Sequence, residues 1–273
     1  MVNDGNPPAP EGLAITVEVR VVVTTVVDGA FQVFLRQRTK PPFLDSWELP
    51  GGPLQPGEGL EDAARRELAK AAPGLDHDVG SRQYHLEQFG AYGDPDPIPE
   101  DAPERVVSIG YWAIVPSLAD TAIGNDVASR KFFPVALVEG GQVGEFVEVR
   151  LAFNHGQMLA DAIEWARDRL EDTTIAASFC GPEFTISELR GVYDAVWRTK
   201  LDPGNFQRKV KQTNDFLVSL QRTNHSDDKA GRPPSGASAP LRGSTLPYRS
   251  PTQVEGDPPG RRAALPGRQL PGR

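Results

Sequence analysis

Apolar residues in the first half of the chain follow patterns typical of β-strands. Leu13 to Val27 and Phe31 to Arg36 are rich in β-branched and aromatic residues, and Asp28-Gly29 between them favours a tight hairpin turn. The stretch from Gly93 to Glu100 is expected to be a loop, because its prolines lack the backbone N–H that regular structure needs. Further extended segments are expected at Tyr84–Tyr92, Val106–Val115 and Phe132–Val135.

Four other stretches predict helices. Residues 59–71 and His155–Leu170 carry apolar residues three or four positions apart, which is the spacing of one helix face. Thr185 to Glu188 forms a capping-box pattern, which begins a helix with an apolar side. Asp202-Pro203 combines an N-cap residue with proline at the first helical position, so another helix is predicted to start there.

The last of these helices has two different faces. Phe206 and Val210 are four residues apart and should face a small core. The opposite side offers donors suited to DNA, since Arg pairs with guanine, Asn or Gln with adenine, and Lys with phosphate. The predicted DNA-binding residues of this helix are Asn205, Arg208, Lys209, Lys211 and Gln212.

Two apolar segments after this helix suggest a β-wing. Phe216–Leu220 and Thr245–Tyr248 flank a long Gly/Pro/Ser-rich loop, which contains Arg232, a sixth predicted DNA-binding residue. Two helices with a short turn, followed by a wing, form a winged helix-turn-helix. A solvated charged helix in an all-helical appendage fits the same spacing, and the spacing alone does not separate the two interpretations.

Length and composition limit the class of protein. The chain has 273 residues, which is enough for two modest domains with cores of their own. It has no apolar run of membrane-spanning length and no basic-then-apolar export signal. Cys180 is the only cysteine, which excludes an internal disulfide and fits a reducing cytoplasm. The four histidines show no metal-ligand spacing, and we predict a cytoplasmic protein with no metal site and no cofactor.

The net charge of −8 hides an asymmetry along the chain. Residues 1–181 have 14 basic and 28 acidic side chains, a net charge of −14, whereas residues 182–273 have 15 basic and 9 acidic, a net charge of +6. A basic C-terminal part joined to an acidic first part suggests that the C-terminal part meets a polyanion. A basic tail without any specific partner gives the same imbalance.

The segment from Leu49 to Gly74 has the layout of a Nudix box. That pattern is Gly, five residues, Glu, seven residues, Arg-Glu, an aliphatic residue, any residue, Glu-Glu, any residue and Gly. A chance match around a simple glycine turn is the alternative, but five matches at fixed spacing favour a Nudix fold. The matching residues are Gly52, Glu58, Arg66, Glu67 and Leu68.

Lys70 and Ala71 stand where the box should have its adjacent glutamates. In an intact box, glutamates at i, i+3 and i+4 of one helix hold divalent cations, which polarise a pyrophosphate and help to generate the attacking hydroxide. Only Glu67 of the three remains, and an ammonium repels a metal ion. Pro73 also takes the place of the last glycine. We therefore predict no catalytic residues and lost or very weak hydrolysis.

Together, the altered box, His85–Pro95 and Phe184–Val196 resemble the NrtR family, Nudix-related transcriptional regulators of NAD metabolism. Asn205–Lys209 is similar to that family's recognition helix, and the similarity covers approximately residues 13–249. It implies an α/β fold, a Nudix α/β/α sandwich followed by a C-terminal winged helix-turn-helix. It further implies a homodimeric repressor of NAD biosynthesis or salvage genes. Such a repressor senses ADP-ribose or a related NAD-derived nucleotide and binds a palindromic operator in double-stranded DNA.

The resemblance also implies an effector site. Arginines would neutralise a diphosphate there, and Trp47 would stack on a base or form part of the wall. Each residue has a structural alternative: Trp47 in the core, Arg66 paired with Glu58 to brace the box loop, and Arg105 simply solvated. The predicted effector-binding residues are Arg38, Trp47, Glu58, Arg66, Glu67 and Arg105.

A second function is compatible with the same residues. An active ADP-ribose pyrophosphohydrolase would bind its metal through Glu58, Glu61 or Glu67 and use the C-terminal domain for dimerisation. For the regulator, the expected organisation is a disordered tail at 1–12, a Nudix-like effector-sensing domain at 13–153, a connecting helix at 154–172, a winged helix-turn-helix domain at 173–249 and a disordered tail at 250–273.

Overall fold

The computed structural model describes residues 15–71, 84–94, 105–116, 129–139, 149–181, 183–213, 216–219 and 248–249. The chain divides into two compact units, Met1–Ala166 and Arg167–Arg273. The division falls inside helix α3 (His155–Asp172), over the stretch predicted as a connecting helix.

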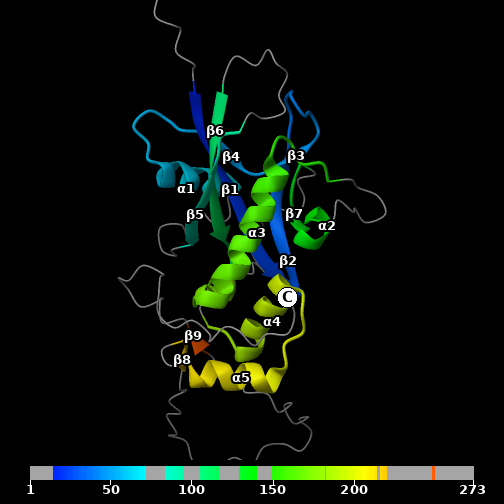
Figure 1. The fold of residues 1–273 in the computed structure, drawn as a ribbon, viewed down its shortest axis with the longest axis vertical. Helices are drawn as coiled ribbons and strands as arrows, with labels where there is room; N and C mark the ends of the chain where they lie inside the picture. The colour runs from blue at the N-terminus through cyan, green and yellow to red at the C-terminus, as the bar shows by residue number, and fades with distance from the viewer. Residues whose placement is uncertain are drawn as a thin grey trace, which may run out of the picture. The chain divides into compact units, whose positions relative to one another are not determined.

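The first unit is built around one mixed β-sheet with helices (Figure 1). Five of its strands follow the order β3-β2-β1-β6-β5, while β4 pairs with β1 and β7 with β2. The pairing of β1 with β6 is parallel, and the other pairings are antiparallel. The elements before α3 are β1 (Ile15–Val27), β2 (Ala30–Gln37), β3 (Trp47–Glu48), β4 (Gly51–Pro53), α1 (Leu60–Ala71), β5 (His85–Tyr92), β6 (Arg105–Ile114), β7 (Arg130–Pro134) and α2 (Val135–Glu139).

Helix α1 packs on one face of the sheet. Its buried residues Ala64 and Leu68 belong to the same core cluster as Val19, Val21 and Val23 of β1. Because successive side chains of a strand point to opposite faces, the residues between these valines face the other side. Both faces of β1 are buried, as expected for a strand at the centre of an α/β sandwich.

Helix α3 crosses the sheet of the first unit (Figure 1). At its start, the Leu49 N–H donates to His155 Nδ1 at 3.2 Å. Two turns later, the Tyr92 hydroxyl of β5 donates to Asp161 at 2.9 Å. Burial and this bond raise the pKa of Tyr92 above its ordinary value. The helix is therefore held at the β3–β4 connection and again at β5, the edge strand.

The hairpin predicted from Asp28-Gly29 is confirmed. Asp28 and Gly29 both have positive φ, 51° and 71°, which is the conformation of a two-residue type I′ turn. The predicted extended segment Phe132–Val135 is confirmed for Phe132–Pro134, which belong to β7, and is wrong at Val135, which begins α2.

The second unit contains the predicted pair of helices. They are α4 (Ile186–Trp197) and α5 (Pro203–Gln212), preceded by the end of α3 and a short 3-10 helix, η2 (Ile175–Phe179). Thr185 and Glu188 form the predicted capping box, and Asp202 caps α5 by accepting from the Asn205 N–H at 2.8 Å. Two short strands, β8 (Val218–Ser219) and β9 (Tyr248–Arg249), pair antiparallel. The winged helix-turn-helix interpretation is thus the one that the fold supports.

Several predictions concern residues outside the described ranges. They include the tails at 1–12 and 250–273, Arg232 of the long wing loop, and the loop beyond Asp94. The described ranges contain no helix with the length and apolar character needed to cross a lipid bilayer.

Candidate functional site

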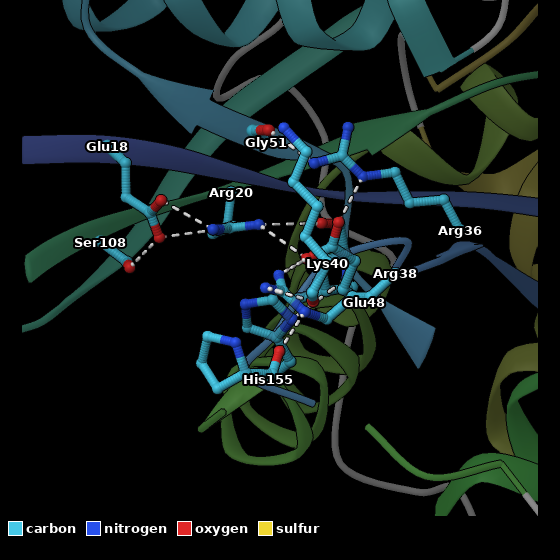
Figure 2. Close-up of polar contacts among 11 residues, drawn as sticks. Glu18, Arg20, Arg36, Arg38, Lys40, Glu48, Gly51, Ser108 and His155 are labelled. Carbon is cyan, nitrogen blue, oxygen red and sulfur yellow. Dashed lines mark hydrogen bonds and ion pairs between the residues drawn. The ribbon is translucent and has the colours of Figure 1, made fainter. Parts of the chain in front are cut away.

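Five charged side chains of the first unit form a compact group that we call the Glu48 cluster: Glu18, Arg20, Arg36, Arg38 and Glu48 (Figure 2). Arg36 Nε donates to Glu48 Oε1 at 2.8 Å, and Arg38 donates to Glu48 Oε2 at 2.5 Å. Arg20 donates twice to Glu18, at 2.7 Å each, and lies 3.7 Å from Glu48. Three guanidiniums face two carboxylates, so the cluster has a net charge of +1.

The strands and loops around the cluster fix its geometry. Ser108 of β6 donates to Glu18 at 2.7 Å, and the Arg36 guanidinium donates to the Gly51 carbonyl of β4 at 3.0 Å. Glycine is required at position 51, because a Cβ atom there would lie 2.2 Å from the Val19 carbonyl oxygen. The Arg38 guanidinium lies over the Phe153 ring, 4.6 Å from its centroid.

His155, the first residue of α3, is buried against this cluster (Figure 2). Burial lowers its pKa well below the ordinary value, and the charges of Arg20, Arg38 and Arg36 lower it further. The imidazole is therefore neutral, and its Nδ1 is free to accept the Leu49 N–H.

A second charged group, the box cluster, consists of Glu58, Arg66, Glu67 and Lys70. Arg66 donates to both oxygens of Glu58, at 2.7 and 2.9 Å, and also to Glu67. Lys70 Nζ donates to the same Glu67 oxygen at 2.8 Å. The hydrogen bonds from Arg66 lower the pKa of Glu58 to about 2, and the bond to Glu58 raises the pKa of Arg66.

The box cluster lies against β4. A Cβ atom at Gly52 would lie 3.0 Å from Glu67 Oε1, so the glycine lets the backbone approach the carboxylate closely. Arg66 also donates to the Pro53 carbonyl at 3.0 Å and thereby holds the box loop. Both clusters thus contact the short strand β4, through Gly51 and Gly52 respectively.

The structure brings the predicted effector-site residues into separate groups. Glu58, Arg66 and Glu67 come together in the box cluster, and Arg38 belongs to the Glu48 cluster. Trp47 is buried, 6% exposed, with its ring against Phe133 at 4.7 Å, so it has the core position given above as its alternative. Arg105 joins neither cluster among the described contacts, and its guanidinium donates to the Gly93 carbonyl at 2.7 Å.

Sequence reasoning missed Arg20, Arg36 and Glu48. One signal was available, because Arg20 interrupts a run of valines in a strand that is buried on both faces. A buried arginine needs a carboxylate partner, which predicts an ion-pair cluster at that point of the sheet. The identity of the partner was not available from spacing, since Arg20 and Glu48 are far apart in the chain.

The predicted DNA-binding face of α5 is exposed in the second unit. Phe206 and Val210 are buried, and Phe206 packs on Tyr193 of α4 at 5.3 Å between ring centroids. The Arg208 guanidinium donates to Asn205 Oδ1 at 2.7 Å, so the two side chains are held together on the surface. Of the five residues predicted on this helix, Asn205, Arg208, Lys211 and Gln212 are exposed and Lys209 is half-buried.

The described residues place no three His, Cys, Asp or Glu side chains where they would hold a metal ion. Cys180 is buried, and burial raises the pKa of its thiol to about 12, which is typical of a structural and not of a reactive cysteine.

A Nudix-type sandwich followed by a winged helix-turn-helix is the architecture of a DNA-binding regulator with an additional Nudix domain. The sequence profile of the NUDIX domain matches residues 17–151, and that of the NrtR DNA-binding winged helix domain matches residues 176–236. The chain belongs to the NrtR family of Nudix-related transcriptional regulators.

Three known proteins illustrate the similarity. The ADPR responsive transcriptional repressor NtrR of Acinetobacter baylyi is 24% identical over 212 residues, which are 75% of this chain and 78% of that protein. The crystal structure of Shewanella oneidensis NrtR matches with a TM-score of 0.58 and 25% identity, covering 74% of this chain and 86% of that one. An ADP-ribose pyrophosphatase of Methanocaldococcus jannaschii is 28% identical over 145 residues, 53% of this chain and 73% of that protein.

Proposed function

We propose that this protein is a cytoplasmic, homodimeric transcriptional repressor. Its winged unit binds a palindromic operator, and its Nudix unit binds ADP-ribose or a related NAD-derived nucleotide without hydrolysing it. The genes under its control are those of NAD biosynthesis or salvage. The observation that carries the proposal is the joining, in one chain, of an NrtR DNA-binding winged helix to a Nudix domain whose box carboxylates are paired with cations.

The exposed side of α5 supports DNA recognition. Arg208 and Asn205 are hydrogen-bonded to each other and carry donors that suit guanine and adenine edges in the major groove. Lys209 and Lys211 supply phosphate contacts, which position the helix without reading sequence. Arg232 would add a contact from the wing. A two-fold symmetric dimer would place two such helices on the half-sites of a palindrome.

Two arginines of the Nudix unit are the proposed contacts for the diphosphate of the effector. Arg38 and Arg66 suit this role, because buried carboxylates hold both guanidinium groups in fixed positions. Glu58 and Glu67 hold Arg66 in place for that contact. Trp47 would act through the wall of the site, because its ring is buried. Arg105 is exposed and reaches a ligand only by leaving the Gly93 carbonyl.

We further propose that the dimer binds DNA in its ligand-free form. A nucleotide in the Nudix unit then favours an arrangement of the two winged units that fits the operator less well. For such a switch the ligand must bind one arrangement more tightly than the other. A tenfold change in occupancy needs about 1.4 kcal/mol of differential affinity, which one charge-assisted phosphate contact supplies.

The test is a gel shift with the DNA upstream of the protein's own gene, with and without ADP-ribose. We expect tight, salt-sensitive binding that ADP-ribose weakens. Arg208→Ala should weaken binding about ten- to hundredfold, because it removes a bidentate base contact. Arg65→Ala is the matched control, since it removes an exposed cation of the Nudix unit whose ion-pair partner among the described residues is Glu61 of the same helix. DNA binding that is equal for the two variants would refute the proposed interface.

A hydrolase is the second candidate, and the similarity to an ADP-ribose pyrophosphatase over the Nudix unit is the observation in its favour. Its metal would need Glu58, Glu61 or Glu67, all of which are engaged by arginine or lysine. Incubation of the pure protein with ADP-ribose and Mg²⁺ or Mn²⁺ separates the two functions. Metal-dependent release of AMP at ordinary enzyme rates would support the hydrolase, whereas intact ADP-ribose supports the sensor.

A further inference from the structure

Lys70 of the box cluster occupies an unusual position for a cation. Its ammonium donates to Glu67 Oε1 at 2.8 Å, although the Glu67 side chain is only 3% exposed. The Lys70 side chain itself is 56% exposed. Since an ammonium has three N–H donors, the contact with Glu67 leaves further donors on a group that faces solvent.

The Nudix fold implies a divalent metal held by box carboxylates, and the residues of this chain do not fit that metal. Glu67 Oε1 already accepts from Arg66 and Lys70, so an incoming cation would meet two positive charges at the same oxygen. Ala71 has no ligand atom, and its side chain is part of the hydrophobic core between α1 and the sheet. The donor set is therefore short of the oxygen ligands that Mg²⁺ requires.

The charges of the box cluster balance without a metal. Arg66 and Lys70 together offset Glu58 and Glu67, so the cluster is neutral. A glutamate at position 70 would change its net charge from zero to −2, and a divalent cation would then be needed before an anionic ligand could approach. The lysine thus supplies at one position the positive charge that a metal supplies in an intact box.

We propose that the Lys70 ammonium takes the place of the metal and binds the diphosphate of the effector directly, so that effector binding needs no divalent cation. This inference rests on the proposed nucleotide-sensing function of the Nudix unit. Glu67 serves as a buried anchor that holds Lys70 in position, and Arg66 adds a second, planar donor group beside it. Lys70 is therefore a specificity-determining residue for phosphorylated ligands.

The experiment is isothermal titration calorimetry of the full chain with ADP-ribose and, separately, with inorganic pyrophosphate. Each titration is done in EDTA and again in Mg²⁺. For the natural protein we expect the same dissociation constant for ADP-ribose in both conditions. Lys70→Gln should weaken ADP-ribose binding at least about tenfold in EDTA, the loss expected for one charge-assisted hydrogen bond. Lys70→Arg should retain most of the affinity.

Arg65→Gln is the matched control, because it removes one positive charge from the same helix at an exposed i,i+4 pair with Glu61. It should leave ADP-ribose affinity unchanged. Charge reversal gives a second readout: Lys70→Glu should abolish ADP-ribose binding in EDTA and regain part of it in Mn²⁺. Thermal melting followed by circular dichroism identifies any variant that does not fold.

Two results would overturn the inference. The first is that the natural protein binds ADP-ribose and pyrophosphate only when Mg²⁺ is present, or does not bind them at all. The other is a folded Lys70→Gln variant with the affinity of the natural protein. A different result would reject the proposed function alone. If ADP-ribose or pyrophosphate binds without metal and this binding depends on Lys70, the role of Lys70 is supported. If the same ligand leaves DNA binding unchanged, the nucleotide is not the operator switch.

Discussion

Glu48 shows how one buried carboxylate organises the centre of the first unit. Its two oxygens are shared by Arg36 and Arg38, and Arg20 lies beside them. The Glu48 side chain is 7% exposed, so solvent screens these contacts weakly. Breaking such a buried group leaves uncompensated charges in a poorly hydrated site, which costs more than the loss of a surface pair.

We predict that Glu48→Gln destabilises the protein by about 3 kcal/mol in urea unfolding, because Arg36 and Arg38 then lose their carboxylate partner and the net charge of the cluster rises from +1 to +2. The matched control is Glu61→Gln, which removes an exposed i,i+4 partner of Arg65 and should change the free energy of unfolding by less than about 0.5 kcal/mol. If Glu48→Gln changes the free energy of unfolding as little as Glu61→Gln does, the Glu48 cluster does not contribute to stability.

His155 makes the stability of the first unit dependent on pH. Its pKa in the folded protein is well below that of an unfolded histidine, near 6.5. As the pH falls through about 6.5, the unfolded chain takes up a proton that the folded protein does not. The free energy of unfolding therefore decreases with falling pH until the pH reaches the pKa of His155 in the folded protein. Between about pH 7.5 and 5.5 this single group should lower the free energy of unfolding by about 1.4 kcal/mol.

His155→Asn isolates that contribution, because an amide oxygen keeps an acceptor for the Leu49 N–H but does not titrate in this range. The measurement is the free energy of unfolding by urea as a function of pH for both proteins. We expect the natural protein to lose stability relative to the variant as the solution becomes more acidic. Parallel pH profiles would contradict a buried neutral imidazole.

At the scale of elements, local capping chemistry fixes where the helices of the second unit begin. Thr185 accepts from the Glu188 N–H at 3.1 Å, and Glu188 accepts in return from the Thr185 N–H at 2.6 Å. Helix α4 ends at Trp197, and the C-cap residue Arg198 has the left-handed conformation, with φ of 52°. The following turn is held by Asp194, which accepts from the Leu201 N–H at 2.8 Å.

Thr185→Ala should therefore cost about 1 kcal/mol of stability, since the first-turn N–H of Glu188 loses its partner. Ser187→Ala, two residues later and exposed, is the matched control and should be neutral within about 0.5 kcal/mol. Urea unfolding of both variants, followed by circular dichroism, gives the comparison. A neutral Thr185→Ala would mean that packing alone determines the start of α4.

Elements with strong local signals were predictable from the sequence. The hairpin at Asp28-Gly29 and the caps of α4 and α5 lie at the predicted residues, because turn and cap chemistry depends on near neighbours. Strands β3 and β4 were not predicted, since two or three residues carry no periodicity and their pairing with β2 and β1 is a tertiary contact. Among the described residues, the paired strands β8 and β9 overlap the predicted wing segments at Val218–Ser219 and Tyr248.

The candidate site was predictable only where its residues share one helix. Spacing along α1 identified Glu67 and Lys70 as neighbours, and the structure confirms that they are in contact. The Glu48 cluster instead assembles residues from β1, β2, β3 and the loop after β2, so no local pattern relates them. Sequence reasoning therefore assigned Arg38 and Glu58 to one site, whereas they belong to different clusters.

At the scale of the whole molecule, α3 links the two units covalently. Its first residue, His155, contacts the β3–β4 connection of the Nudix unit, and the same helix continues beyond Ala166 into the second unit. Charge is also divided between the two parts of the chain, with a net of −14 before residue 182 and +6 after it. The acidic part does not attract DNA, which leaves the C-terminal part to bind the polyanion.

The proposed switch makes a prediction that does not depend on how the units are arranged. If ADP-ribose weakens operator binding by some factor, operator DNA must weaken ADP-ribose binding by the same factor, because the two equilibria form a closed cycle. Typical coupling energies of about 1–3 kcal/mol correspond to roughly 5- to 150-fold effects. The ADP-ribose dissociation constant, measured by calorimetry with and without saturating operator, should therefore rise by the factor seen in gel shifts. Unequal factors would mean that ADP-ribose displaces DNA by competing directly for the winged unit or by acting on the DNA, and not through the Nudix unit.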